Sequence, residues 1–344
     1  MEPLGMSLAT PAAHGGPDAL GAPAHDFSTN ANALGPCPLA LLAIARADAS
    51  RYPDPASTRL KAALADFHRV APERLLLLAS ASEGIQRFSA WAARTAGACV
   101  WLPPHHYGDL SRAAQAWGLA RTPEAGRARL LWACEPSSPL GQAEAGLAER
   151  LAGLRVEQAL VLDQAYAPLR LSGAPSLEGA ALDRVWRLVS PNKALGLTGV
   201  RGAYAIAPLA ARQAVAELEA LAPSWPLGAH AEAMLMAWAA PDTQCWLADS
   251  LDTLRDWKAR QIALCESLGW TVLPSEANYF VARLPAPRDT DALPALRRER
   301  GVKLRDATSF GLPGHVRLGV RSPEDQAALR AAWPRGRGGD NSPR

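Results

Sequence analysis

The middle of the chain alternates between short, almost wholly apolar runs and segments in which apolar residues recur at helical spacing. The runs predict buried strands and the intervening segments predict helices, a pattern typical of parallel strands joined by helical crossovers. This order indicates an α/β fold with a three-layer α-β-α large domain around a mostly parallel sheet. The predicted strands are 74–79, 98–102, 130–133, 159–162, 185–189 and 202–207, and the helices between them are 82–94, 107–117 and 145–154.

The pattern changes on either side of this region. A glycine- and proline-rich stretch and two helices, 39–49 and 58–68, precede it. After it we expect helices at 209–221, 228–239, 244–268, 292–299 and 323–333, and strands at 270–273, 279–283, 302–305 and 316–320. The sequence therefore predicts an N-terminal arm (1–38) that packs with the small domain, a large domain (39–222), a smaller α+β domain (223–334) and a disordered tail (335–344).

Composition narrows the class of protein. The chain has 344 residues, of which 49% are hydrophobic and 20% charged, as in ordinary globular enzymes. Its net charge is +3 and its arginines are scattered along the chain rather than clustered, which disfavours nucleic-acid binding. No basic leader precedes Arg46 and no window holds 18 uninterrupted apolar residues, so we expect neither a targeting segment nor a membrane span. The five cysteines show neither CxxC nor metal-ligand spacing, which favours buried free thiols in a reducing cytoplasm and no metal site.

One lysine stands in a glycine-rich turn directly after a predicted strand. Lysine is scarce here, and Lys193 lies between Ser190 and Arg201; upstream, Asp163 follows another predicted strand and is itself followed by Tyr166. An amine for an aldehyde, a carboxylate for a pyridine nitrogen, and a hydroxyl and a guanidinium for a phosphate are the groups that bind pyridoxal 5'-phosphate (PLP). Because the carboxyl ends of parallel strands meet at one edge of a sheet, we expect these residues to surround PLP, with Lys193, Asp163 and Tyr166 catalytic.

Two further features fit this cofactor. Residues 80–83 (SASE) lie at a strand-to-helix junction, where free N–H groups of Ala81 and Ser82 can bind an anion; the same residues also read as a capping box, and the two roles are compatible. Tyr107 is placed to stack on the cofactor ring, with core packing as the alternative.

Each candidate also has an ordinary structural interpretation. Lys193 can be a solvated loop lysine, Asp163 a helix cap or turn residue, and Tyr166 a core side chain. His105 and His106 lack ligand spacing and are predicted to be structural. The combination, rather than any single residue, supports the cofactor hypothesis.

These motifs occur in the same order in the class I/II aminotransferases of the fold type I PLP enzymes, which the chain resembles from about residue 14 to residue 333. The resemblance implies that Ser138 and Tyr166 contact the phenolic oxygen of PLP and that Arg317 grips a substrate carboxylate with both nitrogens. The matching segments are EPSSPLG (135–141) for the family's N-P-x-N-P-x-G, DQAY (163–166) for D-E-A-Y, the lysine segment (190–201) and VRLG (316–319).

The N-terminal residues narrow the branch. HGG (14–16) and the stretch 26–36 resemble the start of threonine-phosphate decarboxylases of cobalamin biosynthesis, and YPDP (52–55) is shared with histidinol-phosphate aminotransferases. This resemblance implies substrate contacts from His14 and Asn32. It also implies that Tyr52 reaches the cofactor phosphate of a neighbouring subunit, and hence a homodimer. Arg305, otherwise a surface charge, resembles a second anion-binding arginine, which suits a substrate with a carboxylate and a phosphate.

The chain also departs from the family pattern. Ser138 replaces an asparagine that bonds the phenolic oxygen, and Asn192 replaces a hydroxyl residue of the phosphate site. Three functions therefore stay open. The leading hypothesis is an enzyme on a small L-amino acid, with or without a phosphate, most similar to threonine-phosphate decarboxylase; the second is a histidinol-phosphate-type aminotransferase, and the third a non-catalytic PLP-binding module. The bond aligned perpendicular to the ring decides between the first two, and the sequence does not give that angle.

Overall fold

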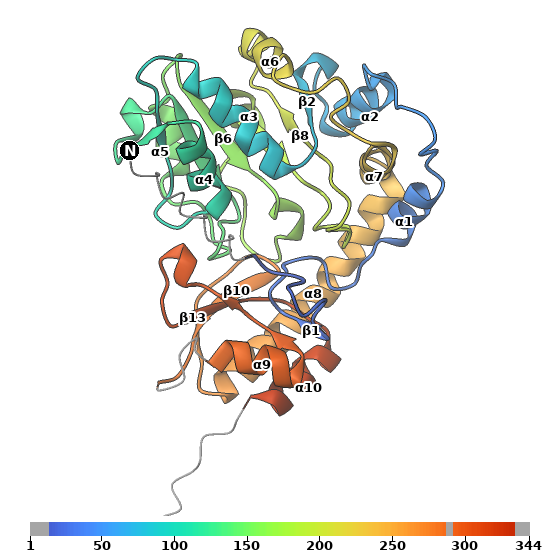
Figure 1. Cartoon of the computed structure of the whole chain (residues 1–344), viewed down its shortest axis with the longest axis vertical. Helices are drawn as coiled ribbons and strands as arrows, with labels where there is room; N and C mark the ends of the chain where they lie inside the picture. The colour runs from blue at the N-terminus through green and yellow to red at the C-terminus, as the bar shows by residue number, and fades with distance from the viewer. Residues whose placement is uncertain (1–13, 287–291, 334–344) are drawn as a thin grey trace, which may run out of the picture.

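The structure, a computed structural model, describes residues 14–286 and 292–333. Two units lie one above the other in Figure 1, a larger one around an extended sheet and a smaller one beneath it. Residues 1–13 of the predicted arm and the predicted tail at 335–344 lie outside the described residues. The division at residue 222 stays a prediction.

The sheet of the larger unit is mostly parallel, as the sequence predicts. Its strand order is β2-β8-β7-β6-β5-β3-β4, and β8 runs antiparallel to both of its neighbours while the pairs from β7 to β4 are parallel. Strand β2 therefore points the same way as β7. The strands are β2 (Leu75–Leu78), β3 (Cys99–Trp101), β4 (Ala120–Arg121), β5 (Leu130–Cys134), β6 (Ala159–Asp163), β7 (Trp186–Val189) and β8 (Ala203–Ile206).

Helices cover both faces of this sheet, which confirms the three-layer prediction. They are α1 (Pro38–Ala45), α2 (Thr58–His68), α3 (Ala81–Ala93), α4 (Gly108–Ala116), α5 (Leu147–Ala152), α6 (Arg212–Glu219) and α7 (Ala229–Trp238). In β2, Leu76 and Leu78 pack with α3, α4 and α6, whereas Leu75 and Leu77 pack with α1, α2 and α7. Successive strand residues point to opposite faces, so a run of four leucines suits a strand buried on both sides.

The smaller unit combines an antiparallel sheet of order β12-β13-β10-β9 with helices. Its elements are α8 (Pro241–Ser267), β9 (Thr271–Val272), β10 (Tyr279–Arg283), α9 (Leu293–Arg300), β11 (Val302–Lys303), β12 (Arg305–Asp306), β13 (His315–Gly319) and α10 (Pro323–Ala332). The N-terminal strand β1 (His25–Asp26) pairs in parallel with β11, and Phe27 is fully buried in the apolar core of this unit. Residues 25–27 are therefore part of the smaller unit's structure.

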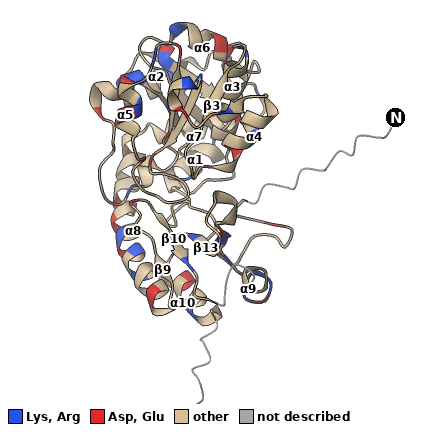
Figure 2. Ribbon diagram, turned by 90° about the vertical axis from the view of Figure 1, so that its left-hand side faces the viewer, with Lys and Arg blue, Asp and Glu red and all other residues tan. Residues whose placement is uncertain are grey.

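Helix α8 joins the two units. It packs against α1 and α7 at one end and against β9 and α10 at the other, as Figure 1 shows. Its outer surface carries Lys and Arg interspersed with Asp and Glu (Figure 2). Within the described residues, no helix combines the length and the apolar character that a membrane crossing requires.

Two expectations need correction. The helix predicted at 39–49 ends at Ala45, because Asp48 accepts the backbone N–H of Ser50 and so closes a turn that competes with the helix. The prediction of buried thiols holds for Cys37 and Cys265 but is wrong for Cys245, which is exposed on α8.

Candidate functional site

Functional side chains gather at the carboxyl edge of the larger sheet. Asp163 is the last residue of β6 and pairs in register with Cys134, the last residue of β5, while Ser190 follows β7 directly. A cavity of about 590 Å³ opens over this edge, between the two units. That volume lies in the range typical of small-molecule sites.

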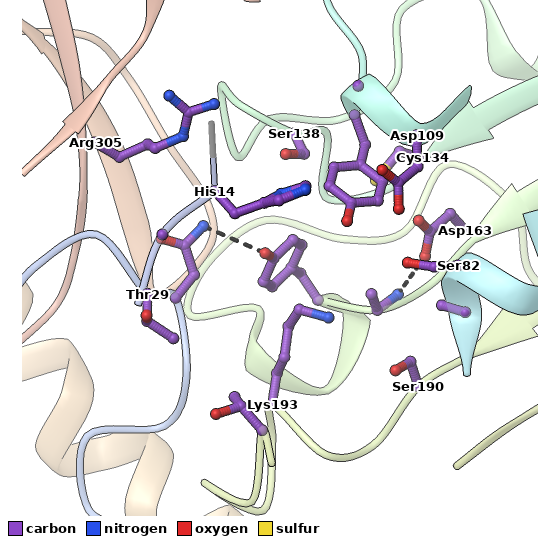
Figure 3. A pocket seen from close by; sticks show the side chains of 18 of the residues that line it. His14, Thr29, Ser82, Asp109, Cys134, Ser138, Asp163, Ser190, Lys193 and Arg305 are labelled. Carbon is purple, nitrogen blue, oxygen red and sulfur yellow. Dashed lines mark hydrogen bonds between the residues drawn. The ribbon is translucent and has the colours of Figure 1, made fainter. Parts of the chain in front are cut away.

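The cavity brings together most of the residues predicted from the sequence. Those that line it are His14, Ala81, Ser82, Tyr107, Ser138, Asp163, Tyr166, Ser190, Lys193, Arg201, Arg305 and Arg317. Figure 3 shows His14 and Arg305 on one side of the cavity and Asp163, Ser82 and Ser190 on the other. Asn32 and Tyr52 do not line it. The roles assigned to individual residues stay predictions.

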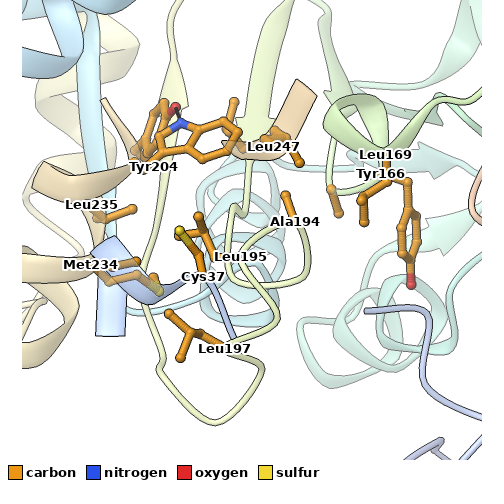
Figure 4. Close-up of a cluster of buried hydrophobic side chains, with 14 of the residues drawn as sticks. Cys37, Tyr166, Leu169, Ala194, Leu195, Leu197, Tyr204, Met234, Leu235 and Leu247 are labelled. Carbon is orange, nitrogen blue, oxygen red and sulfur yellow. Dashed lines mark hydrogen bonds between the residues drawn. The ribbon is translucent and has the colours of Figure 1, made fainter. Parts of the chain in front are cut away.

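Lys193 presents a free amine to the cavity. Its Nζ lies 5.4 Å from the centre of the Tyr166 ring, and it makes no hydrogen bond or ion pair with any described residue. The residues that follow it are anchored, because Ala194 and Leu195 are fully buried in an apolar cluster with Met234 and Leu235 of α7 (Figure 4). A reactive lysine needs this combination of a fixed backbone and an uncommitted amine.

Asp163 is a buried carboxylate without a cation against it. Its Oδ1 accepts the backbone N–H of Ala165 at 2.9 Å, and within the described part of the chain it forms no ion pair. Burial raises the pKa of this carboxyl above its usual range, and the positive charge of Lys193 opposes that shift. A protonated pyridine nitrogen would supply the missing countercharge, so this residue fits the predicted PLP.

The candidate anion site predicted from the sequence lies at the start of α3. Ser80 caps the helix by accepting the backbone N–H of Glu83 at 3.0 Å, which confirms one half of the capping box, whereas the Glu83 carboxylate accepts the N–H of Ala79 rather than that of Ser80. The N–H groups of Ala81 and Ser82 have no acceptor within the helix, and both residues line the same cavity. The capping contact leaves these two N–H groups uncommitted, and the anion-binding role stays a prediction.

The opposite wall of this anion site comes from the lysine loop. Arg201 lines the cavity and forms no hydrogen bond or ion pair with any described residue, so its guanidinium is available to a phosphate. The Ser190 hydroxyl donates to Asn192 Oδ1 at 3.0 Å, and the Asn192 amide reaches the carbonyl oxygens of Thr198 and Val200. Asn192, which the sequence marks as a departure, braces this loop.

Two tyrosines flank the space between Lys193 and the anion site. Burial raises the pKa of Tyr107 to about 12, so its phenol stays protonated at neutral pH. The Tyr166 hydroxyl accepts the amide of Asn30 at 3.4 Å, and its ring packs edge-on against Tyr279 with centroids 4.6 Å apart. The Tyr166 ring is thus fixed in place, and both tyrosines combine core packing with cavity lining.

Two arginines line the side of the cavity that faces the smaller unit. Arg305 on β12 and Arg317 on β13 are directly opposite each other in the sheet, and both are buried. Arg317 makes only long bonds, to Ser138 Oγ at 3.4 Å and to the Ser28 carbonyl at 3.3 Å, and its Nε has no partner among the described residues. Burial lowers the pKa of Arg305, and the nearby charge of Arg317 lowers it further.

Of three further predicted residues, Asn32 lies differently from the expectation, and the roles of Tyr52 and Ser138 stay predictions. Asn32 is buried beside the cavity, where its amide donates to Ser250 Oγ at 2.8 Å, and Asn30 lines the cavity instead. Tyr52 is 80% exposed and stacks on Trp225 with centroids 4.5 Å apart. Ser138 lies beside Arg317 and accepts its hydrogen bond.

Sequence reasoning missed several lining residues. Asn30 lies within the stretch that carried the family resemblance, so that stretch was the available signal. Thr29 lies in the same stretch. Asp109, Cys134 and Phe310 also line the cavity, and no motif marks them. Their places follow from the meeting of segments next to strands β3, β5 and β13, which are distant in the chain. Within the described residues, no cluster of three or more His, Cys, Asp or Glu side chains is arranged to hold a metal ion.

Sequence comparison places this site in a known context. The family model described as aminotransferase class I and II matches residues 118–332. A histidinol-phosphate aminotransferase of Halorubrum lacusprofundi is 31% identical over 331 residues, covering 88% of this chain and 87% of the relative. The match therefore extends over both units and includes the lysine loop and both arginines.

Solved structures share the fold. A histidinol-phosphate aminotransferase from Sinorhizobium meliloti, determined in complex with pyridoxal-5'-phosphate, has a TM-score of 0.75 at 20% identity and covers 90% of each chain. The L-threonine-O-3-phosphate decarboxylase of Porphyromonas gingivalis has a TM-score of 0.73 at 18% identity, covering 89% of this chain and 97% of the other. At these identities the similarity is one of architecture.

Proposed function

The chain belongs to the class I and II aminotransferase family and is a PLP-dependent enzyme, and from this premise we propose that it acts on a small phosphorylated amino compound. The observation that carries the proposal is the pair of buried arginines, Arg305 and Arg317, in the cavity that also holds Lys193. Two adjacent guanidinium groups repel each other, so their placement favours a ligand with two negative groups.

Bound PLP supplies an aldehyde that takes up an amine and a ring that accepts the electron pair of a bond at the substrate's α-carbon. In this chain Lys193 Nζ would hold that aldehyde covalently and, once released, move a proton at the α-carbon. Asp163 would hold the proton on the pyridine nitrogen. The Ser82 hydroxyl with the nearby backbone N–H groups and Arg201 would bind the phosphate, and Tyr107 would lie against the ring.

The first candidate reaction is decarboxylation of a phosphorylated L-amino acid such as threonine phosphate. Arg317, with its unpartnered Nε, would bind the carboxylate, and Arg305 the phosphate. The grip of Arg317 sets which bond at the α-carbon stands perpendicular to the ring. The length of its bonds to Ser138 and Ser28 supports this role, because a guanidinium so weakly held can turn toward a substrate.

The second candidate is amino-group transfer from a histidinol-phosphate-like substrate to a 2-oxo acid. The name of the Halorubrum lacusprofundi relative, at 31% identity over most of both chains, favours it. In that reaction Arg305 would bind the substrate phosphate, and Arg317 a carboxylate of the 2-oxo acid. A place in amino-acid biosynthesis follows from this candidate, and one in cobalamin biosynthesis from the first; a cytoplasmic location suits both.

Spectroscopy and turnover test the proposal in sequence. Purified enzyme with PLP is expected to show a visible absorption band that borohydride removes and that Lys193→Ala lacks. We then expect CO2 from L-threonine O-phosphate, or glutamate from histidinol phosphate and 2-oxoglutarate. The absence of turnover with both phosphorylated substrates would count against the proposed substrate class.

A matched variant tests the assignment of Arg317. Arg317→Ala is expected to weaken substrate binding by about 10–100-fold, the effect of removing a charged hydrogen-bonding group, while the cofactor band survives. Arg283→Ala, an exposed arginine on the neighbouring strand β10, is the control. Loss of the cofactor band in Arg317→Ala would show that this arginine supports PLP rather than the substrate.

We further propose a homodimer whose sites are shared. Tyr52 lies outside the cavity of its own chain, exposed beside the largely apolar outer side of α1, where Leu39, Leu41 and Leu42 are also exposed. Tyr52 would bind the cofactor phosphate of the partner chain. Mixed dimers of Lys193→Ala and Tyr52→Ala subunits would then hold one intact site, and we expect activity that neither parent variant has. A mixture as inactive as its parents would contradict shared sites.

A further inference from the structure

The two cavity arginines share a single aromatic ring. The guanidinium carbon of Arg305 lies 4.9 Å from the centre of the Phe310 ring, and that of Arg317 lies 5.4 Å from it. The two arginines are also cross-strand partners, an arrangement in which like charges repel. Because an aromatic face attracts a cation, Phe310 offsets part of this repulsion and sets where each guanidinium lies.

Phe310 is in turn held from the other side of the cavity. It ends a short 3-10 helix, η6 (Thr308–Phe310), between β12 and β13, and its carbonyl oxygen lies 2.7 Å from Nδ1 of His105. His105 belongs to the larger unit, in the loop between β3 and α4. Among the described residues, this is the hydrogen bond that ties η6 to the larger unit. The ring of His105 also lies over Gly311, the next residue.

The acceptor in this hydrogen bond determines which ring nitrogen of His105 carries a hydrogen. A carbonyl oxygen can only accept, so His105 Nδ1 must carry the hydrogen. A neutral imidazole with that tautomer and a protonated imidazolium both donate from Nδ1. The link is therefore maintained in either charge state of His105, which suits a permanent structural tie.

We infer that His105 is a positioning residue for substrate recognition: through Phe310 it fixes the spacing of Arg305 and Arg317 and thereby the preference for a doubly anionic amino substrate. The inference rests on the proposed function and deepens it. Arg305 also donates to Ser309 Oγ at 2.8 Å, so movement of η6 carries this arginine with it. The position of Arg317 depends less on η6, because Arg317 also contacts Ser138 of the larger unit.

A matched pair of ligands makes the effect measurable in the PLP-loaded enzyme. L-Threonine O-phosphate and L-threonine differ by one phosphate, and their binding is followed by the change in the cofactor absorption band, whichever reaction follows. We expect wild-type enzyme to prefer the phosphorylated ligand and His105→Ala to lower that preference about tenfold, the effect of one lost hydrogen bond. The affinity for L-threonine and the cofactor band should change little.

Side-chain length provides the matched controls. The amide nitrogen of an asparagine can reach the place of Nδ1, whereas that of a glutamine lies nearer the place of Nε2. His105→Asn is therefore expected to restore the preference and His105→Gln to leave it low. Phe310→Leu should lower it as well, and His105→Ala on that background should add little, because both act through the same ring.

The outcomes separate the two claims. A wild-type enzyme without preference for the phosphorylated ligand would overturn the proposed substrate class, and this inference with it. A wild-type preference that His105→Ala leaves intact, or that His105→Asn and His105→Gln affect equally, would overturn the positioning role alone.

Discussion

The backbone N–H of Asn32 donates to the carbonyl oxygen of Lys193, with nitrogen and oxygen 2.8 Å apart. The Asn32 amide also donates to the next carbonyl, that of Ala194, and to Ser250 on α8. A few residues on, the N–H of Cys37 donates to the carbonyl of Leu195. The N-terminal segment thus forms one wall of the lysine loop and fixes the backbone from which the reactive amine extends.

A glycine permits this close approach, and its replacement should disturb the loop. At Gly196 the backbone angle φ is +66°, and an added Cβ would lie 2.7 Å from the Gly35 Cα. We therefore expect Gly196→Ala to destabilise the protein by about 2 kcal/mol and to weaken PLP binding. Gly199→Ala, in the same loop with open space around it, is the control in thermal unfolding and PLP titration. Equal behaviour of both variants would show that the contact is unimportant.

Much of the fold could be predicted because periodicity was strong. Runs such as Leu75–Leu78 and Ala159–Asp163 are apolar on both faces and leave little choice of element. The same logic placed Asp163 and Ser190 at one edge of the sheet, since parallel strands end together. Two-residue strands such as β1 and β4 carried no such signal, because they are too short for a period to show.

The substrate side of the cavity could not be predicted in the same way. Phe310 and His105 are distant in the chain, and their contact depends on how one unit docks on the other. His105 lacks metal-ligand spacing in the sequence, which predicts a structural role and does not reveal its contact with Phe310. The family resemblance covers both Asn30 and Asn32, and only the backbone path decides which side chain faces the cavity.

Replacement of Asp163 should affect stability and activity in opposite directions. Its folded-state pKa is raised by burial, so in the protein without PLP the ionised form costs stability, a cost that builds up as the pH rises from the unfolded-state pKa to the folded-state pKa and is complete above it. Asp163→Asn keeps an acceptor for the Ala165 N–H and removes the charge. We expect the PLP-free variant to be more stable at pH 7 by on the order of 1 kcal/mol, a gain that shrinks toward pH 4.

With PLP bound, the same variant should lose activity by about 10²-fold or more, because the ring nitrogen loses its countercharge. Thermal unfolding of the PLP-free proteins against pH and turnover of the loaded enzymes measure the two effects. A PLP-free variant less stable than wild type at pH 7 would contradict the assignment of Asp163 as an unpaired buried charge.

A second group of buried charges connects the two units. Arg170 forms an ion pair of 2.7 Å with Glu135, which directly follows β5, and a second one with Glu276 in the loop before β10. Glu135 is almost fully buried and also accepts the N–H of Ser176. Removal of the shared cation leaves a buried carboxylate uncompensated, so we expect Arg170→Met to cost about 3 kcal/mol in urea unfolding.

The double variant Arg170→Met/Glu135→Gln should recover much of the lost stability, because it no longer contains an unpaired buried carboxylate at position 135. Arg155→Met breaks the exposed pair with Glu157, whose N–O distance is 2.8 Å, and should change stability by less than about 0.5 kcal/mol. Similar losses in the buried and exposed variants would show that burial adds nothing to the Arg170 pairs.

Lys258 should make stability depend on pH in the alkaline range. It lies on α8, is buried, and its Nζ donates to the carbonyl oxygens of Ser275 at 2.5 Å and Ala277 at 2.8 Å. Burial lowers its pKa to about 8, and the nearby charge of Glu276 opposes this. The folded state therefore holds the proton less tightly than the unfolded chain, in which a lysine titrates near about 10.4.

For a folded-state pKa below the unfolded value, the stabilising contribution is fully present above the unfolded pKa and is lost as the pH falls through the folded one. Wild type should therefore gain stability relative to Lys258→Met between about pH 8 and about pH 10.4, by up to about 3 kcal/mol. Both amine forms can donate to the two carbonyls, so the hydrogen bonds persist throughout this window. Arg260→Met, an exposed position on the same helix, is the control, since an arginine does not titrate in this range. Urea unfolding at intervals of pH measures the difference, and a constant difference between wild type and Lys258→Met would mean that burial does not shift this amine.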